Sequence, residues 1–394
     1  MKPGSWPALV TIYLYGVLGS ASLSKIIPLQ QDLAIHLGAT PSQFALLISL
    51  LTIPPAVLAA VGGSFIDRIG AHRALIAAAS LGAVVNLAYL LAPTLLAFQT
   101  LRVIEGCVIL GAYSAAPGLI IATTTPQRRG PAMAFWSTYT PVGVSLGLAL
   151  ASLFAGSEFW RGGYLVHGLL WTVMAFAGAL LPSPPARPPA AADAARPSLM
   201  AAYARPGPLR VAATFAALVV MGFGVNTVFP SWFSQNHGVT LAAASRLLAL
   251  ANLTMIIGSF MVLMLIARGT APSGAFVTIA VASTVAVALL FAEGQPLPLL
   301  LGALLVWQIT AGGAIAVVTA SLPGVIAHPS QGAAAAGLLS QLAALATFAT
   351  PPLWLWALGT RRAGSFVAIV VIAWVLALLL LPRRDRTRRT AVES

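Results

Sequence analysis

The sequence Gly-Ser-Phe-Ile-Asp-Arg-Ile-Gly-Ala-His-Arg spans residues 63–73 and lies between two long apolar segments. Only 7% of the chain is charged, so this charged stretch predicts a loop outside the apolar phase. Gly63 and Gly70 let the backbone turn and approach its neighbours closely. Asp67 can accept hydrogen bonds from amides at a helix N-terminus and pair with an arginine. We expect a tight turn between two membrane-spanning helices.

The composition places the whole chain in a membrane. Hydrophobic residues make up 59% of the 394 residues, which leaves too little polar surface for a water-soluble globule. Continuous apolar runs favour helices over a β-barrel, so the predicted class is an all-α integral membrane protein. Windows of about 20 apolar residues predict twelve spans: 7–29, 43–62, 74–92, 95–123, 131–155, 163–181, 210–231, 243–266, 274–292, 298–324, 333–357 and 364–381.

A proline-rich segment divides these spans into two sets of six. Residues 182–208 hold eight prolines in 27 residues, which favours an extended linker. The predicted parts are therefore a first bundle (1–181), a cytoplasmic linker (182–208), a second bundle (209–381) and a basic tail (382–394). Leu-Gly-Ala-Thr at 37–40, after Pro28, is echoed by His-Gly-Val-Thr at 237–240, after Pro230, which indicates a duplication.

The distribution of Lys and Arg predicts the orientation. With a cytoplasmic N-terminus, fifteen of these residues lie inside and four outside, the latter being Arg161, Arg246, Arg361 and Arg362. Both termini are then cytoplasmic, in the inner membrane of the cell. The net charge of +13 fits a basic inner face against anionic lipid. A nucleic-acid partner is not expected, because basic and aromatic residues are not interleaved.

The loop at 63–73 resembles the signature of the major facilitator superfamily, G-x-x-x-D-R-x-G-x-x-R, carried here by Gly63, Asp67, Arg68, Gly70 and Arg73. His72 departs from the basic residue that is frequent there. Arg102-x-x-Glu105 and the stretch Arg128-Arg129-Gly130 resemble the same family's fourth helix and following loop. The resemblance implies twelve helices in two six-helix bundles that rock in alternating access. It also implies that the five signature residues form a conformational latch.

The fourth span carries one polar stripe. Gln99, Arg102, Glu105 and Tyr113 fall within an arc of about 120°, and Cys107 lies on the other side. Glu105 is the only acid well inside a span. Burial favours its neutral form and Arg102 favours its charged form, so we expect Glu105 and Arg102 to couple transport to protons. A purely structural ion pair is the alternative.

Lys25 is the other cation inside a span. It either snorkels to the interface or faces a central cavity. In the second case Lys25 and Arg102 would form a pocket for a small organic anion. The residues predicted to line the substrate site are Lys25, Arg102, Tyr15, Trp136, Tyr139, Asn226, Trp307 and Gln308. Each aromatic or amide residue in this set could equally be a packing residue.

The fifth span holds Pro141, Gly143 and Gly147, which predict a kink and a close helix approach. These residues only partly resemble the antiporter motif of the family, because Thr140 precedes Pro141 and the paired glycines are absent. The partial match keeps open an alternative function, proton-driven export of lipophilic or multidrug compounds.

The remaining residues give no sign of other chemistry. The five histidines show no ligand-like spacing and are expected to be ordinary loop or interface residues: His36, His72, His167, His237 and His328. No metal, cofactor, enzymatic activity or ATP drive is expected. The predicted protein is a monomeric, proton-coupled secondary transporter of a small organic anion. A non-transporting membrane receptor is the remote alternative.

Overall fold

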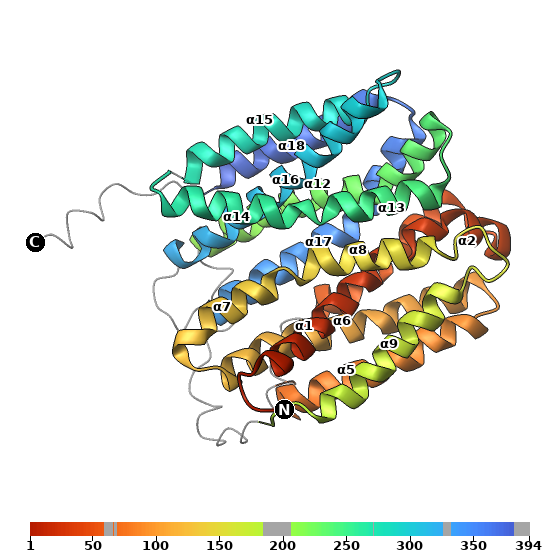
Figure 1. Cartoon of the computed structure of the whole chain (residues 1–394). Coiled ribbons are helices and arrows are strands. Elements are labelled where there is room, and N and C mark those ends of the chain that lie inside the picture. The colour runs from red at the N-terminus through yellow and green to blue at the C-terminus, as the bar shows by residue number, and fades with distance from the viewer. Residues whose placement is uncertain (59–65, 67–68, 184–205, 271, 326–331, 382–394) are drawn as a thin grey trace, which may run out of the picture.

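The computed structural model describes residues 1–58, 66, 69–183, 206–270, 272–325 and 332–381. Throughout these ranges the regular structure is helical, without strands. Ten helices in them are long and apolar enough to cross a membrane, and Pro41–Leu50 is a shorter apolar helix. The predicted all-α class is confirmed, and the helices lie side by side along one common direction (Figure 1).

The helices follow the predicted spans closely. In the first half of the chain they are α1 Trp6–Ser24, η1 Ile27–Leu29, α2 Gln30–Leu37, α3 Pro41–Leu50, α5 Ala71–Ala88, η2 Tyr89–Leu91, α6 Leu95–Thr123, α7 Pro126–Ser137, α8 Tyr139–Ser152 and α9 Gly162–Ala179. In the second half they are α12 Pro206–His237, α13 Leu241–Asn252, α14 Thr254–Ala267, α15 Pro272–Leu290, α16 Leu297–Ser321, η3 Leu322–Val325, α17 Gly332–Gly359 and α18 Ala363–Leu380.

Some predicted spans consist of two helices. The span 131–155 is interrupted at Thr138, between α7 and α8. Pro141 has no N–H to donate to the carbonyl of Ser137, which explains why α7 ends there. The span 243–266 is similarly divided at Leu253, between α13 and α14.

The repeated segments adopt the same local structure. Gly38 and Gly238 have φ values of 64° and 65°, which are left-handed and favour glycine. Thr40 and Thr240 then cap the next helix, each accepting a hydrogen bond from the backbone amide three residues later. The two prolines of the repeat differ in local structure, because Pro28 lies in the short helix η1 whereas Pro230 lies inside α12.

The charged loop is described only in part. Gly63, Asp67 and Arg68 lie outside the described residues. Gly70 has a φ of 88° and precedes α5, as expected of a glycine that turns the chain into a helix. Arg73 is exposed in the first turn of α5. The role of these residues as a latch therefore stays a prediction.

Glycines bring α1 and α8 close together. A Cβ added at Gly143 would collide with the carbonyl of Val17, and one at Gly147 would collide with Ala21 and Ser24. Glycines also let α14 and α16 approach closely, because Gly258 and Gly312 each face a backbone carbonyl of the opposite helix. These contacts are of the small-residue type that lets membrane helices approach closely.

Each half of the chain packs mainly within itself. In the first half α1 packs on α8, and α5 packs on α6 and α9; in the second half α12 packs on α17, and α16 packs on α14 and α15. The halves meet where α8 contacts α13 and where α3 contacts α17. The linker at 184–205 and the tail at 382–394 lie outside the described residues, and α12 already begins at Pro206.

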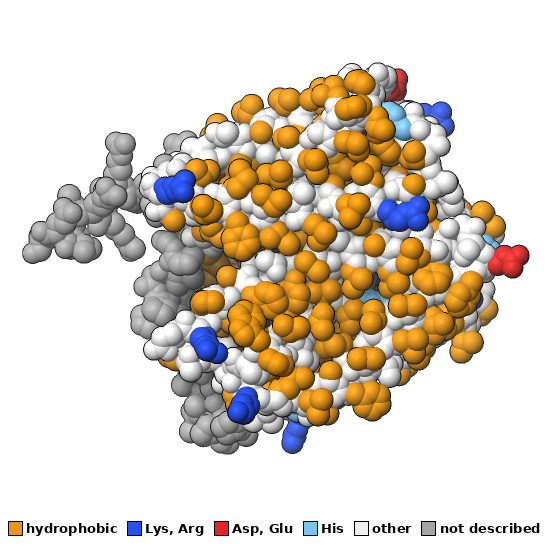
Figure 2. Space-filling model, in the orientation of Figure 1, with side chains coloured by type: hydrophobic (Ala, Val, Ile, Leu, Met, Phe, Trp, Pro, Cys, Tyr) orange, Lys and Arg blue, Asp and Glu red, His pale blue; other side chains and the backbone are white. Residues whose placement is uncertain are grey.

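The surface matches a membrane environment. Hydrophobic side chains cover most of the face shown in Figure 2, while charged side chains lie mainly toward its two ends. Large exposed residues such as Phe176, Leu250 and Trp356 would be unfavourable in water. In a bilayer they face lipid tails.

Candidate functional site

Lys25 lies at the C-terminal end of α1 and points into the first half of the molecule. Its side chain is 2% exposed. The ammonium group donates to Glu105 Oε1 at 2.5 Å and to Asn86 Oδ1, and it lies 3.0 Å from His167 Nδ1. The interpretation that Lys25 snorkels to the interface is therefore wrong, because buried acceptors surround its charge.

Glu105 lies at the centre of the same group of side chains. It is fully buried, and Oε1 accepts from Lys25. Oε2 accepts from Arg102 Nη1 at 3.0 Å and from the Tyr89 hydroxyl at 3.0 Å. The two oxygens thus receive three donors, which favours the ionised carboxylate.

Arg102 spreads its guanidinium group across three elements. Nε donates to the carbonyl of Leu47 at 2.9 Å, and Nη1 donates to the carbonyl of Ser22 at 2.9 Å as well as to Glu105. Nη2 is buried and has no hydrogen-bond partner among the described residues. The predicted pairing of Arg102 with Glu105 is confirmed. The two hydrogens on Nη2 have no acceptor among the described residues.

Of the four residues predicted to form a polar stripe on the fourth span, Arg102 and Glu105 are shown to lie together on one buried face, whereas Tyr113 contacts Ser20 and Tyr139. Arg102 and Glu105 are one turn apart on α6 and fully buried, whereas Cys107 is exposed on the other side. The three-residue spacing places both side chains on one face of the helix. This part of the site was readable from the sequence.

His167 and Asn86 belong to this site, and sequence reasoning missed both. His167 is fully buried in α9 and contacts Lys25, which corrects the expectation that it is an ordinary loop or interface residue. Its Nε2 lies 3.2 Å from the carbonyl of Leu18, which can only accept, so Nε2 carries a hydrogen. Nδ1 of the neutral ring then accepts from Lys25, and it also lies 3.1 Å from Asn86 Oδ1. Asn86 Nδ2 donates to the carbonyl of Gly82 at 2.8 Å, which leaves Oδ1 facing Lys25. Polar residues inside predicted spans were the available signal.

Two tyrosine rings complete the surroundings of Lys25. Its Nζ lies 4.8 Å from the ring centroid of Tyr164 and 5.5 Å from that of Tyr89, within cation–π range. We name this set the charged cluster: Lys25, Asn86, Tyr89, Arg102, Glu105, Tyr164 and His167.

The predicted aromatic residues lie elsewhere. Trp136 and Tyr139 have ring centroids 4.4 Å apart, and Tyr113 lies 4.9 Å from Tyr139. The Tyr113 hydroxyl is 2.6 Å from Ser20 Oγ on α1. We name Trp136, Tyr139 and Tyr113 the aromatic group. Tyr15 is apart from it, fully buried, and donates to the carbonyl of Met174 at 2.7 Å, which is a packing position between α1 and α9.

The predicted amide residues form a chain in the second half. Gln308 donates to Asn226 Oδ1 at 3.0 Å, and Asn226 Nδ2 lies 3.4 Å from Asn252 Oδ1. Asn252, which sequence reasoning missed, then donates to the carbonyl of Pro141 at 2.8 Å and to Ser145 Oγ at 3.2 Å. We name Gln308, Asn226 and Asn252 the amide chain. It connects α16, α12 and α13 to α8 of the other half.

Trp307, the neighbour of Gln308, is 2% exposed. Its Nε1 is buried and has no hydrogen-bond partner among the residues that the structure describes. The ring belongs to a hydrophobic core cluster that includes residues of both halves, so packing explains its position.

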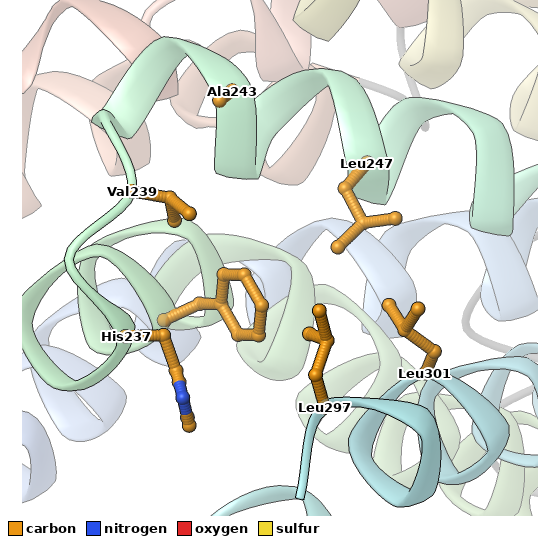
Figure 3. A pocket seen from close by; sticks show the side chains of 7 residues that line it. His237, Val239, Ala243, Leu247, Leu297 and Leu301 are labelled. Carbon is orange, nitrogen blue, oxygen red and sulfur yellow. The ribbon is translucent and has the colours of Figure 1, made fainter.

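An apolar cavity of about 360 Å³ lies at one end of the second half (Figure 3). The residues that line it are Phe233, His237, Val239, Ala243, Leu247, Leu297 and Leu301. None of the predicted binding residues is among them. Among the described residues, no group of three or more His, Cys, Asp or Glu side chains could hold a metal ion.

The fold and the buried charges together are those of a membrane carrier. The sequence profile of the Major Facilitator Superfamily matches residues 12–351. The chain belongs to this family of transporters.

A curated relative is the MFS-type transporter tstD of Talaromyces stipitatus. It is 26% identical over 166 residues, which are 42% of this chain and 29% of that protein. The match therefore spans less than a third of the relative.

Solved transporters share the whole fold. A bacterial homologue of the human lysosomal transporter Spinster, inward-facing and occupied, has a TM-score of 0.77 at 15% identity, with 96% of this chain and 97% of that chain covered. The xylose transporter XylE from E. coli, in its inward open conformation, has a TM-score of 0.75 at 15% identity, with 96% of both chains covered. These structures bear out the two-bundle, twelve-helix fold.

Proposed function

We propose that this transporter moves a small organic anion across the cytoplasmic membrane by alternating access, coupled to protons. Members of the family are generally carriers rather than enzymes, so the energy would come from an ion gradient. The distribution of Lys and Arg supports cytoplasmic termini in an inner membrane. A monomer suffices for this function, because each chain has both halves.

The observation that carries the anion proposal is the charge of the charged cluster. Lys25 and Arg102 bring two positive charges and Glu105 brings one negative charge, so the sum is +1. Arg102 Nη2 has no partner among the described residues. A carboxylate would accept from Nη2 and balance the charge, and an arginine suits a planar carboxylate geometrically. Arg102 is fully buried, so the solute would reach it in another conformation.

A second candidate is export of lipophilic compounds driven by protons. The aromatic group favours it, because Trp136, Tyr139 and Tyr113 bring three large ring surfaces together near α1. Such a compound would not need Arg102. The two candidates therefore differ in how binding responds to a change of this residue.

Thermal stabilisation of the purified protein tests the proposal. Lactate, pyruvate and benzoate are the anionic probes, and tetraphenylphosphonium is the lipophilic cation. A ligand that binds the folded state raises the unfolding temperature according to its concentration over its Kd. We expect stabilisation by at least one carboxylate. Arg102→Lys should abolish it, because lysine lacks the fork that holds a carboxylate.

The matched control is Arg246→Lys, because Arg246 is exposed and should leave the stabilisation unchanged. A carboxylate that binds is then tested for uptake into proteoliposomes under an inward proton gradient, with a protonophore as the comparison. Stabilisation by tetraphenylphosphonium that persists in Arg102→Lys, without any carboxylate effect, would favour the exporter instead.

A further inference from the structure

We infer that Lys25, rather than Glu105, carries the coupled proton, and that the protein is an electroneutral symporter of one proton with one monocarboxylate. The inference rests on the proposed function and deepens it. It follows from the hydrogen bonds and the charge balance of the charged cluster.

The surroundings of Glu105 favour its ionised form. Its oxygens accept from Lys25, Arg102 and Tyr89, and all three are donors. A proton on the carboxyl group would remove the negative charge that these donors face and leave Lys25 and Arg102 as two buried positive charges without a counter-ion. Glu105 therefore serves as the fixed negative charge of the cluster.

Lys25 differs, because a nitrogen acceptor faces it. His167 Nδ1 lies 3.0 Å from Lys25 Nζ, and the contact of His167 Nε2 with the carbonyl of Leu18 leaves the Nδ1 lone pair of the neutral ring to accept from Lys25. Asn86 Oδ1 lies 3.1 Å from Nδ1 and can accept from it once Nδ1 is protonated. When Lys25 gives up its proton, Nζ keeps the electron pair and Nδ1 receives the proton. His167 is fully buried here, so the imidazolium would release its proton to water in a conformation that opens the charged cluster to one side of the membrane. Asn86 Oδ1 and Glu105 remain as acceptors for the two hydrogens left on Nζ.

The charged, titratable and polar groups that face Lys25 come from several helices. Glu105 and Arg102 lie on α6, His167 and Tyr164 on α9, and Tyr89 on η2, with the neutral Asn86 on α5. Within the described part of the chain, Glu105 is the one acid in this set. No second carboxylate there competes for the role of proton carrier.

Charge balance couples the proton to the solute. With Lys25 protonated the cluster has a charge of +1, and a bound monocarboxylate brings the charge to zero. Without solute, loss of the Lys25 proton also brings it to zero. Anion alone or proton alone leaves an unbalanced charge at full burial, which is unfavourable in a low-dielectric interior. The carrier therefore changes conformation either with both the proton and the anion bound or with neither of them bound.

Proton uptake on binding is the first test, and it uses the unaltered protein. Lactate and benzoate are added separately to the purified transporter in weakly buffered detergent solution with a pH indicator. We expect uptake of about one proton per bound carboxylate, at pH values where Lys25 is neutral before the anion binds. Binding by calorimetry without proton uptake at any pH would overturn the inference while leaving the proposed function intact.

Lys25→Arg is the matched variant. Arginine keeps the positive charge and cannot release its proton, so the empty carrier stays at +1. We expect the ratio of accumulation driven by a proton gradient to exchange of labelled for unlabelled lactate, measured on the same variant, to fall at least tenfold. Lys2→Arg is the control, because Lys2 is exposed and is the other lysine of the chain. Normal accumulation by Lys25→Arg would overturn the role of Lys25.

The electrical response gives a third readout. An electroneutral cycle carries no net charge, so a potassium diffusion potential imposed with valinomycin should leave lactate uptake unchanged. Uptake that rises with an inside-positive potential would mean that the anion enters without its compensating proton. Failure of every carboxylate to bind would instead reject the proposed function, and with it this inference.

Discussion

Glu105 shows how one side chain determines the energetics of the charged cluster. It is the acidic partner of both Lys25 and Arg102. Removing one member of a buried ion pair leaves an uncompensated charge and costs about 3–5 kcal/mol. The stability of the first half should therefore depend on the net charge of the charged cluster as well as on the identity of its residues.

Two substitutions in the charged cluster should compensate each other. Glu105→Gln raises the net charge from +1 to +2 and is expected to lower the unfolding temperature strongly. Lys25→Gln in the same molecule returns the net charge to +1 and should recover part of the loss. The measurement is a double-mutant cycle of thermal unfolding.

Glu158→Gln is the control for that cycle, because Glu158 is exposed and its loss should have little effect. Strictly additive effects of the Lys25 and Glu105 changes would contradict the coupling.

At the scale of elements, glycine positions decide how closely helices approach. Gly147 faces Ala21 and Ser24 on α1, and Gly312 faces Met255 on α14. Membrane helices gain association from close packing, because lipid tails are as apolar as the side chains. Sequence reasoning predicted a close helix approach at Pro141, Gly143 and Gly147 without naming the partner helix, and it missed the contact at Gly312.

Gly147→Ala should destabilise the protein by about 1–3 kcal/mol, because the added methyl group overpacks the contact between α1 and α8. Gly118→Ala on α6 is the comparison, since open space surrounds it. That change should be neutral or slightly stabilising, because alanine has the higher helix propensity. Thermal unfolding in detergent distinguishes the two, and equal effects would contradict the packing argument.

At the scale of the whole molecule, hydrogen bonds connect the two halves. Ser231 donates to Gln30 Oε1 at 2.6 Å, Ser49 donates to the carbonyl of Phe348 at 2.6 Å, and Asn252 donates to the carbonyl of Pro141. In alternating access the halves rock against each other. These contacts would therefore break and re-form in each cycle.

A cysteine pair at Gln30 and Ser231 should lock the halves together. In a background with Cys107→Ala, oxidation of this pair is expected to abolish carboxylate uptake in proteoliposomes, and reduction should restore it. The control pair replaces Thr360 and Ser365, whose hydroxyl groups are 3.0 Å apart within the second half. A cross-link there should leave uptake intact, and unimpaired uptake by the cross-linked Gln30 and Ser231 pair would argue against rocking at this contact.

The sequence by itself determined the membrane class, the helical spans and the stripe of Arg102 and Glu105. These features depend on composition and on contacts within one helix, which the order of residues specifies directly. The left-handed turns at Gly38 and Gly238, each followed by a threonine cap, are local in the same sense.

Only the tertiary structure decided which distant residues meet. Asn86 and His167 join Lys25 from 61 and 142 residues away along the chain, and no local pattern encodes such contacts. The structure likewise separated Tyr15, Trp136 and Gln308 from the charged cluster, because the helix faces that carry them turn toward other neighbours. Helix packing brings together side chains whose sequence positions are unrelated, so the membership of the site could not be read from the chain alone.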